Sequence, residues 1–232
     1  MTKGILYGVG VGPGDPELMT VKAVRTVERC PVIALPQSGR GECTAYEIAK
    51  EAVPALEKKE KLLLSMPMTR DQDTLLESWR EAADQIARKL DLGQDVAFLT
   101  LGDPAVYSTY LYLHRLVEKM GYEARMIPGV PSFCAAAARL GWGLCENRQP
   151  LHILPASYDG TEEALSLPGT KVLMKAGSCA AEVMDALGKR GLRSRTGLVV
   201  NCGMAGEKAY QSLETTPEEQ GYFSLYIVKE EE

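Results

Sequence analysis

Three segments of the sequence combine glycine and proline in the manner of sharp turns that hold a ligand. They are GVGVGPGDPEL (residues 8–18), TLGDPAVYSTY (residues 100–110) and IPGVPSF (residues 127–133). The first contains Gly10, Gly12 and Gly14. Glycine has no Cβ, so its backbone adopts positive φ angles or approaches a ligand closely. We therefore predict that these segments are binding loops.

Two familiar nucleotide-binding patterns do not fit the first segment. G-x-G-x-x-G would need glycine at Asp15, and no acidic residue ends the following strand at Leu35 and Pro36. The pattern that ends in Gly-Lys-Ser/Thr is missing as well. The tripeptide Gly-Asp-Pro, at residues 14–16 and 102–104, also suits a helix start, because aspartate caps helices and proline opens them. A helix start alone does not explain the three glycines.

Short strands that alternate with amphipathic helices must position these loops. Strands are expected at residues 5–10, 31–35, 95–101, 123–127, 151–156, 171–174, 196–201 and 222–228, and the tail from residue 206 indicates two strands around a polar turn. Apolar residues at helical spacing run from Leu75 to Leu90 and from Leu113 to Met120. The alternation predicts an α/β fold with largely parallel sheets. We place a domain boundary near residue 123, which divides the chain into 1–123 and 124–232.

Length and composition are those of an ordinary globular protein. The 232 residues are 45% hydrophobic and 25% charged, with a net charge of −5. This charge argues against nucleic-acid binding, which needs a clustered positive field. No apolar run approaches the roughly 20 residues of a membrane span, and no secretory signal is present, so we expect a cytoplasmic protein that does not bind membranes. The six cysteines are scattered and there are only two histidines, so we expect free thiols and no metal site.

Five motifs resemble, in order and spacing, the tetrapyrrole (corrin/porphyrin) methyltransferases. They are GVGVGPGDPELMTVKAV, SMPMTRD, VAFLTLGDPAVYSTY, IPGVPSFCAAAARLG and VLMKAG. The likeness covers nearly the whole chain, and GDPAVYSTY, the Pro-Met pair and LMK most resemble the branch that methylates carbon 20 of precorrin-2 or cobalt-factor II. The resemblance implies two α/β domains with mixed, largely parallel sheets, a cofactor cleft between them and a homodimer. It also implies S-adenosylmethionine as methyl donor in cobalamin biosynthesis.

The resemblance assigns cofactor-binding roles to residues in five regions of the chain. Lys175 stands where relatives often have methionine, and the sequence around Gly203 departs from the commoner glutamate-rich form. The implied cofactor-binding residues are Pro13, Leu101, Gly102, Asp103, Val106, Pro131, Ser132, Lys175 and Gly203.

The implied reaction needs positioning more than activation. An electron-rich tetrapyrrole carbon attacks the methyl group directly, and a base then removes one proton. Asp103 and Tyr107 are the candidates for this base, although a helix cap and a core aromatic residue are the simpler explanations for them. The carboxylates of the substrate suit arginine, although each candidate arginine is also explained as a solvated surface charge. The candidates are Arg40, Arg70, Arg139 and Arg148.

Two other functions stay open at this point. A relative within the same family would methylate another tetrapyrrole position. A non-catalytic α/β module that senses a nucleotide is the second alternative, because the sequence has no unmistakable nucleophile or metal ligand.

Overall fold

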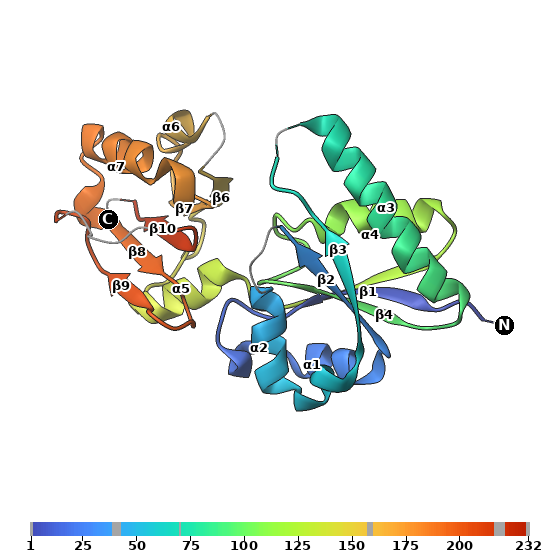
Figure 1. Ribbon diagram of the computed structural model, residues 1–232. Coiled ribbons are helices and arrows are strands. Elements are labelled where there is room, and N and C mark those ends of the chain that lie inside the picture. Colours follow the sequence, from blue (N-terminus) through green and yellow to red (C-terminus); the bar gives the residue numbers. More distant parts are fainter. Residues whose placement is uncertain (1, 39–42, 70, 157–159, 216–220, 231–232) are drawn as a thin grey trace. The chain divides into compact units, whose positions relative to one another are not determined.

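The protein consists of two compact α/β units, Met1–Pro131 and Ser132–Glu232, seen in a computed structural model (Figure 1). The structure describes residues 2–38, 43–69, 71–156, 160–215 and 221–230. The division falls after Pro131 rather than after residue 123, because the strand Glu123–Ile127 pairs with the first strand of the chain.

The first unit alternates strands and helices along the chain. Its elements are β1 (Ile5–Gly10), η1 (Pro16–Leu18), α1 (Val21–Arg29), β2 (Val32–Gln37), α2 (Thr44–Ala52), η2 (Pro54–Lys58), β3 (Glu60–Ser65), α3 (Gln72–Asp91), β4 (Val96–Thr100), α4 (Tyr110–Lys119) and β5 (Glu123–Ile127). The strands form one parallel sheet in the order β3-β2-β4-β1-β5. The carboxyl ends of β4, β1 and β5 therefore lie side by side at one edge.

Helices cover both faces of this sheet (Figure 1). On one face, residues of α1 and α2 such as Val27 and Ile48 pack with Val9 and Leu99. On the other, α3 and α4 pack against Leu6 and Phe98 and their neighbours. Strands that are buried on both sides read as continuous apolar runs, which is why β1 and β4 are apparent in the sequence.

Glycine follows both long helices of the first unit, and an aspartate caps the start of α3. Asp71 caps α3 by accepting a hydrogen bond from Thr74 N at 2.9 Å, and Gly93 follows the helix with φ of 73°. Gly121, with φ of 83°, follows α4 in the same way. Glycine adopts this left-handed conformation without the steric cost that a Cβ imposes.

The second unit has a mixed sheet. Its elements are α5 (Ser132–Leu140), β6 (Leu151–Pro155), α6 (Thr161–Ala164), β7 (Thr170–Met174), η3 (Gly177–Cys179), α7 (Ala180–Lys189), η4 (Arg193–Arg195), β8 (Thr196–Val200), β9 (Lys208–Tyr210) and β10 (Ser224–Val228). The order is β6-β7-β10-β8-β9, with β10 antiparallel to β7 and β8. Helices α6 and α7 cover one face, where Leu165, directly after α6, and Leu187 of α7 are buried. On the other face, Leu140 and Trp142 lie against Gly197 of β8.

The fold confirms the predicted α/β class with one parallel and one mixed sheet. Every expected strand is present, and the tail holds the two late strands β9 and β10. β3 was not predicted. Among the helices of the described ranges, none combines the length and the apolar character that a bilayer crossing requires.

Candidate functional site

The candidate site of the first unit lies at the carboxyl ends of β1, β4 and β5. Gly10 at the end of β1 pairs with Thr100 at the end of β4, and Val9 pairs with Ile127 on the other side. β1 leads to α1 on one face of the sheet, whereas β4 leads to α4 on the opposite face. Ligands of open α/β sheets bind at such a switch point, where the connections from adjacent strands diverge.

The loops after β1 and β4 are joined directly through their backbones. Gly102 N donates to Gly12 O at 2.7 Å, and Gly12 N donates back to Gly102 O at 3.3 Å. Gly12 and Gly102 have φ angles of 80° and 70°, which a residue with a Cβ rarely adopts. These two glycines are therefore required by backbone conformation.

Gly10 and Gly129 are required by close packing. A Cβ at Gly129 would lie 2.1 Å from Gly102 O, and a Cβ at Gly10 would lie 2.5 Å from the same oxygen. Gly10 thus leaves room for the neighbouring loops. We call the contact of Gly10, Gly12, Gly102 and Gly129 the glycine junction.

Asp103 ties this junction together through both carboxylate oxygens. Oδ1 accepts a hydrogen bond from Ala105 N at 2.8 Å, and Oδ2 accepts one from Gly129 N at 3.0 Å. No helix begins here, because α4 starts only at Tyr110, so the helix-start explanation of Gly102-Asp103-Pro104 is wrong. At the first Gly-Asp-Pro, Asp15 does cap a helix, the short η1, by accepting from Glu17 N.

The loop after β4 is closed by a buried pair of hydroxyl groups. Thr100 Oγ1 and Ser108 Oγ lie 2.8 Å apart, and Ser108 Oγ also accepts from Tyr110 N at 3.2 Å. Between them, Tyr107 has φ of 47° and leaves 40% of its surface exposed, so it is not a core residue. Burial of part of the side chain raises the pKa of Tyr107 above its usual value. The hydroxyl is therefore protonated at neutral pH and suits hydrogen-bond donation.

The other predicted residues of the first unit lie on the same loops. Pro13 is buried next to the junction, whereas Leu101 and Val106 are half-buried on the β4 loop. Val106 N donates to Asp103 O at 3.2 Å, which keeps this loop compact. Pro131 is half-buried at the end of the β5 loop.

In the second unit, Lys175 and Gly203 follow β7 and β8. Both strands run antiparallel to β10 between them, so their carboxyl ends lie at the same edge of the sheet. Lys175 has φ of 57°. The residue as a whole is exposed, but its ammonium group is partly surrounded by protein, and this loss of water lowers the pKa of the ammonium group. Gly203 has φ of 74°. Ser132 is the first residue of α5.

The candidate arginines differ in their environment. Arg139, at the end of α5, forms an ion pair with Glu207 through Nε. Arg148 is exposed between α5 and β6. Arg40 and Arg70 lie outside the described residues. Sequence reasoning missed Glu207, Thr100, Ser108 and the packing role of Gly129, because residue types alone do not show which of these groups contact one another.

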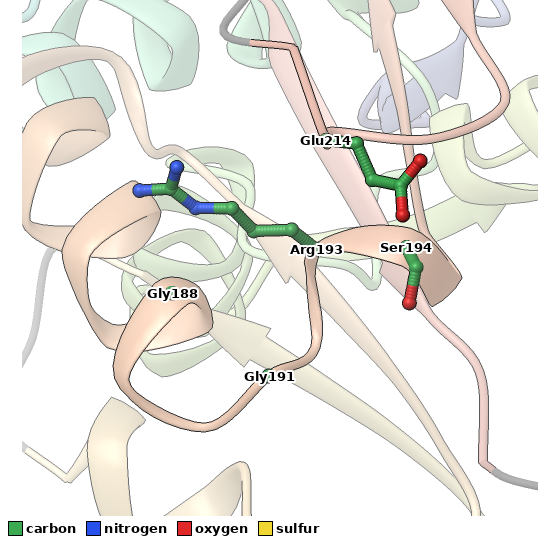
Figure 2. A pocket seen from close by; sticks show the side chains of 5 residues that line it. All are labelled: Gly188, Gly191, Arg193, Ser194 and Glu214. Atoms are coloured by element: carbon green, nitrogen blue, oxygen red, sulfur yellow. The ribbon is translucent and has the colours of Figure 1, made fainter.

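A separate pocket of the second unit contains none of the predicted site residues (Figure 2). Gly188, Gly191, Arg193, Ser194 and Glu214 line it. Arg193 donates to the carbonyl of Met184 in α7 from Nη2 at 3.1 Å and from Nε at 3.3 Å, so its guanidinium ties η4 to the middle of α7. This pocket is part of the α7 connection. Across the described ranges, His, Cys, Asp and Glu form no cluster able to hold a metal ion.

The protein thus has two α/β units, each with its own sheet, and the candidate site residues lie on loops at the carboxyl ends of strands. The chain belongs to the tetrapyrrole (corrin/porphyrin) methylases, whose family model matches residues 5–217. This confirms the family that the five motifs predict.

Curated relatives indicate a branch of the family. The chain is 31% identical over 241 residues to precorrin-2 C(20)-methyltransferase of Sinorhizobium sp, covering 97% of this chain and 95% of the relative. It is 35% identical over 171 residues to the probable cobalt-precorrin-2 C(20)-methyltransferase of Methanocaldococcus jannaschii, covering 73% and 71%.

A longer relative and a solved structure complete the comparison. Cobalamin biosynthesis protein CobIJ of Mycobacterium tuberculosis is 32% identical over 236 residues, which are 97% of this chain but 46% of CobIJ. The chain thus spans about half the length of that relative. Uroporphyrin-III C-methyltransferase from Thermus thermophilus, solved with S-adenosylhomocysteine, matches with a TM-score of 0.71 and 23% identity over 98% of both chains. This likeness shows a shared fold.

Proposed function

We propose that the protein is an S-adenosylmethionine-dependent methyltransferase that acts on carbon 20 of precorrin-2 or cobalt-factor II in cobalamin biosynthesis. The observation that carries the proposal is the similarity to C(20)-methyltransferases, which extends over nearly the whole chain for one relative. The glycine junction supports it, because the junction lies where α/β sheets bind their ligands.

The residues of the junction fit the proposed cofactor. A carboxylate oxygen has about two acceptor positions, and each oxygen of Asp103 uses one for a main-chain N–H. The remaining positions suit the hydroxyl groups of a ribose or an ammonium group. Leu101 and Val106 offer half-buried apolar surface for an adenine ring. We assign cofactor binding to these residues together with Pro13, Gly102, Pro131, Ser132, Lys175 and Gly203.

S-adenosylmethionine, when bound, supplies an electrophilic methyl group, so the residues of the chain have to orient the reactants. Such positioning contributes about 7–11 kcal/mol when it replaces a bimolecular encounter. The glycine junction suits this task, because its loops contact one another through backbone atoms and no side-chain rotamer has to change when the cofactor binds. Tyr107, protonated at neutral pH, would donate a hydrogen bond. Asp103, directly or through a water molecule, would accept the proton that carbon 20 loses.

The substrate carboxylates need cationic partners. We propose Arg148 for this role together with Arg40 and Arg70, while the ion pair of Arg139 points to a different task, which is argued below. Substitution of Arg148 with glutamine is expected to raise the KM for the tetrapyrrole and to leave the affinity for S-adenosylmethionine unchanged.

Turnover with each candidate substrate tests the proposed function. The purified protein would be supplied with methyl-labelled S-adenosylmethionine and either precorrin-2 or cobalt-factor II. Release of S-adenosylhomocysteine and a labelled methyl group at carbon 20, located by NMR, are the expected results. A methyl group at another carbon would assign the protein to a different member of the family. Cofactor binding without release in either reaction would favour a sensor module and refute the enzyme.

We further propose that the protein is a cytoplasmic homodimer. The resemblance to the family suggests the dimer, and the six free thiols suit the reducing cytoplasm. Light scattering on the purified protein is expected to give twice the chain mass of 25.3 kDa, and cell fractionation is expected to recover the protein in the cytosolic fraction.

A further inference from the structure

One carboxylate of the second unit joins a helix to the loop that contains Gly203. Glu207 Oε1 accepts from Nε of Arg139 at the end of α5, and Glu207 Oε2 accepts from Gly203 N at 2.7 Å. Arg139 and Glu207 are 68 residues apart in the sequence. A displacement of either side chain would thus be transmitted to the backbone of the loop after β8.

This loop has a backbone that needs external support. Within residues 201–207, three residues have left-handed φ angles: Asn201 (51°), Gly203 (74°) and Gly206 (78°). For asparagine this conformation costs free energy relative to a right-handed one. Two turn hydrogen bonds form inside the loop, from Met204 N to Asn201 O at 2.9 Å and from Glu207 N to Met204 O at 3.1 Å. The Glu207 carboxylate adds the contact that connects the loop to α5.

The electrostatics of Glu207 agree with a functional contact. Burial raises the pKa of the carboxyl, but the hydrogen bond from Gly203 N and the charge of Arg139 outweigh it and leave the pKa below its ordinary value. Glu207 is therefore ionised at neutral pH. Its side chain is 23% exposed, whereas that of Arg139 is 55% exposed.

The exposure of Arg139 limits its contribution to overall stability. Ion pairs in contact with water contribute little to folding, because solvent screens the attraction and two long side chains must be ordered. The local consequence is different, since the pair fixes the orientation of the carboxylate that holds Gly203 N. An effect on ligand binding without a matching effect on unfolding is the signature of such a contact.

We propose that Arg139 is a positioning residue rather than a ligand of the substrate carboxylates. Through Glu207, it holds the loop of residues 201–207 in the conformation that receives S-adenosylmethionine. This inference rests on the proposed function, which places Gly203 at the cofactor. It reassigns a residue whose type and place in the sequence suggested substrate recognition.

A double-mutant cycle tests the proposal. Calorimetry would give the Kd for S-adenosylmethionine of the wild type, Arg139→Gln, Glu207→Ala and the double variant. We expect each single variant to weaken binding about tenfold, and the double variant to be no weaker than Glu207→Ala, because both changes break one chain of contacts. Arg139→Lys should recover part of the affinity, since lysine retains the charge but not the planar donor geometry.

Controls separate positioning from folding and from substrate binding. The exposed ion pair of Asp185 and Lys189 in α7 is the matched control, and Lys189→Gln is expected to change neither the Kd nor the urea midpoint. The urea midpoint of Arg139→Gln should stay close to that of the wild type. The KM for the tetrapyrrole, measured at saturating S-adenosylmethionine, should be unchanged.

Three results would overturn the inference: a Kd for S-adenosylmethionine within twofold of wild type in both single variants, effects that multiply in the double variant, or an Arg139→Gln defect confined to the tetrapyrrole KM. Failure of the proposed function looks different, because the wild-type protein itself would then not bind S-adenosylmethionine.

Discussion

Replacement of Gly129 by alanine should disrupt the glycine junction without changing any charge. Gly129 has no left-handed φ, so alanine meets no intrinsic backbone penalty there. The new methyl group would lie 2.1 Å from Gly102 O and 2.8 Å from the carbonyl carbon of Gly10. All of these are backbone atoms, and no flexible side chain can move aside to relieve the clash.

The size of the effect follows from the distances. Ordinary carbon contacts begin at about 3.5 Å, so the β4 and β5 loops must separate by roughly 1.4 Å from the distance of 2.1 Å. The same movement would stretch the 3.0 Å hydrogen bond from Gly129 N to Asp103 Oδ2 beyond bonding distance. Overpacking and the loss of a hydrogen bond to a charged group together cost about 2–4 kcal/mol of unfolding free energy.

Urea unfolding and calorimetric titration with S-adenosylmethionine would measure both consequences of Gly129→Ala. The expected results are a loss of about 2–4 kcal/mol in unfolding free energy and at least a tenfold weaker Kd, because a displacement of about 1 Å is costly in a preorganised site. Gly143→Ala is the control, since its methyl group would have only Glu146 Oε1 nearby, at 3.8 Å. Wild-type stability and affinity in Gly129→Ala would refute the close packing of the junction.

Three further predictions concern charge and protonation. Asp103→Asn should weaken S-adenosylmethionine binding about tenfold, because the amide offers one acceptor oxygen for two N–H groups, and should lower kcat at least a hundredfold if Asp103 accepts the proton; an unchanged kcat at saturation would restrict it to binding. Lys175→Met should bind S-adenosylmethionine at pH 7 at least as tightly as the wild type, because it removes a cation near a proposed cationic ligand; a large calorimetric loss would contradict this. Burial raises the thiol pKa values of Cys30 and Cys202 from 9.0 to about 12 and about 11. The folded state holds these protons more tightly than the unfolded state does. The unfolding free energy is therefore unaffected by the thiols below pH 9 and falls by about 1 kcal/mol per thiol between pH 9 and pH 10. Urea midpoints that are equally pH-dependent after Cys→Ala substitution at both sites would exclude the thiols as the cause.

Buried elements of the fold were predictable, whereas an edge strand was not. β1 and β4 lie inside the parallel sheet, and their apolar runs reflect burial on both faces. β3 lies at one edge of the sheet, opposite β5, with a single buried residue, Leu64, and with Glu60 and Lys61 exposed. Charges protect edge strands from unwanted pairing, but they also remove the apolar pattern by which a strand is recognised. β3 therefore becomes apparent only through its pairing with β2.

The candidate site shows the same division between local and long-range information. Turn chemistry placed the three loops, because glycine and proline act on the backbone nearest to them. Roles that depend on distant partners could not be inferred in this way. Asp103 accepts a hydrogen bond from Gly129, 26 residues later, and Arg139 pairs with Glu207. Without these partners, the sequence suggested that Asp103 caps a helix and that Arg139 binds the substrate.

Both units use a carboxylate in the same manner to hold a proposed cofactor-binding loop. Asp103 in the first unit and Glu207 in the second each accept a main-chain N–H from a glycine-containing loop. Such bonds hold backbone in place without placing a bulky side chain at the site. Methyl transfer to carbon requires this kind of support, because conversion of the sulfonium to a neutral thioether provides the driving force and misalignment of the reactants is the main obstacle. Substitution of these carboxylates should therefore weaken S-adenosylmethionine binding by more free energy than it removes from the stability of the fold. The proposed calorimetric and unfolding measurements distinguish these two effects.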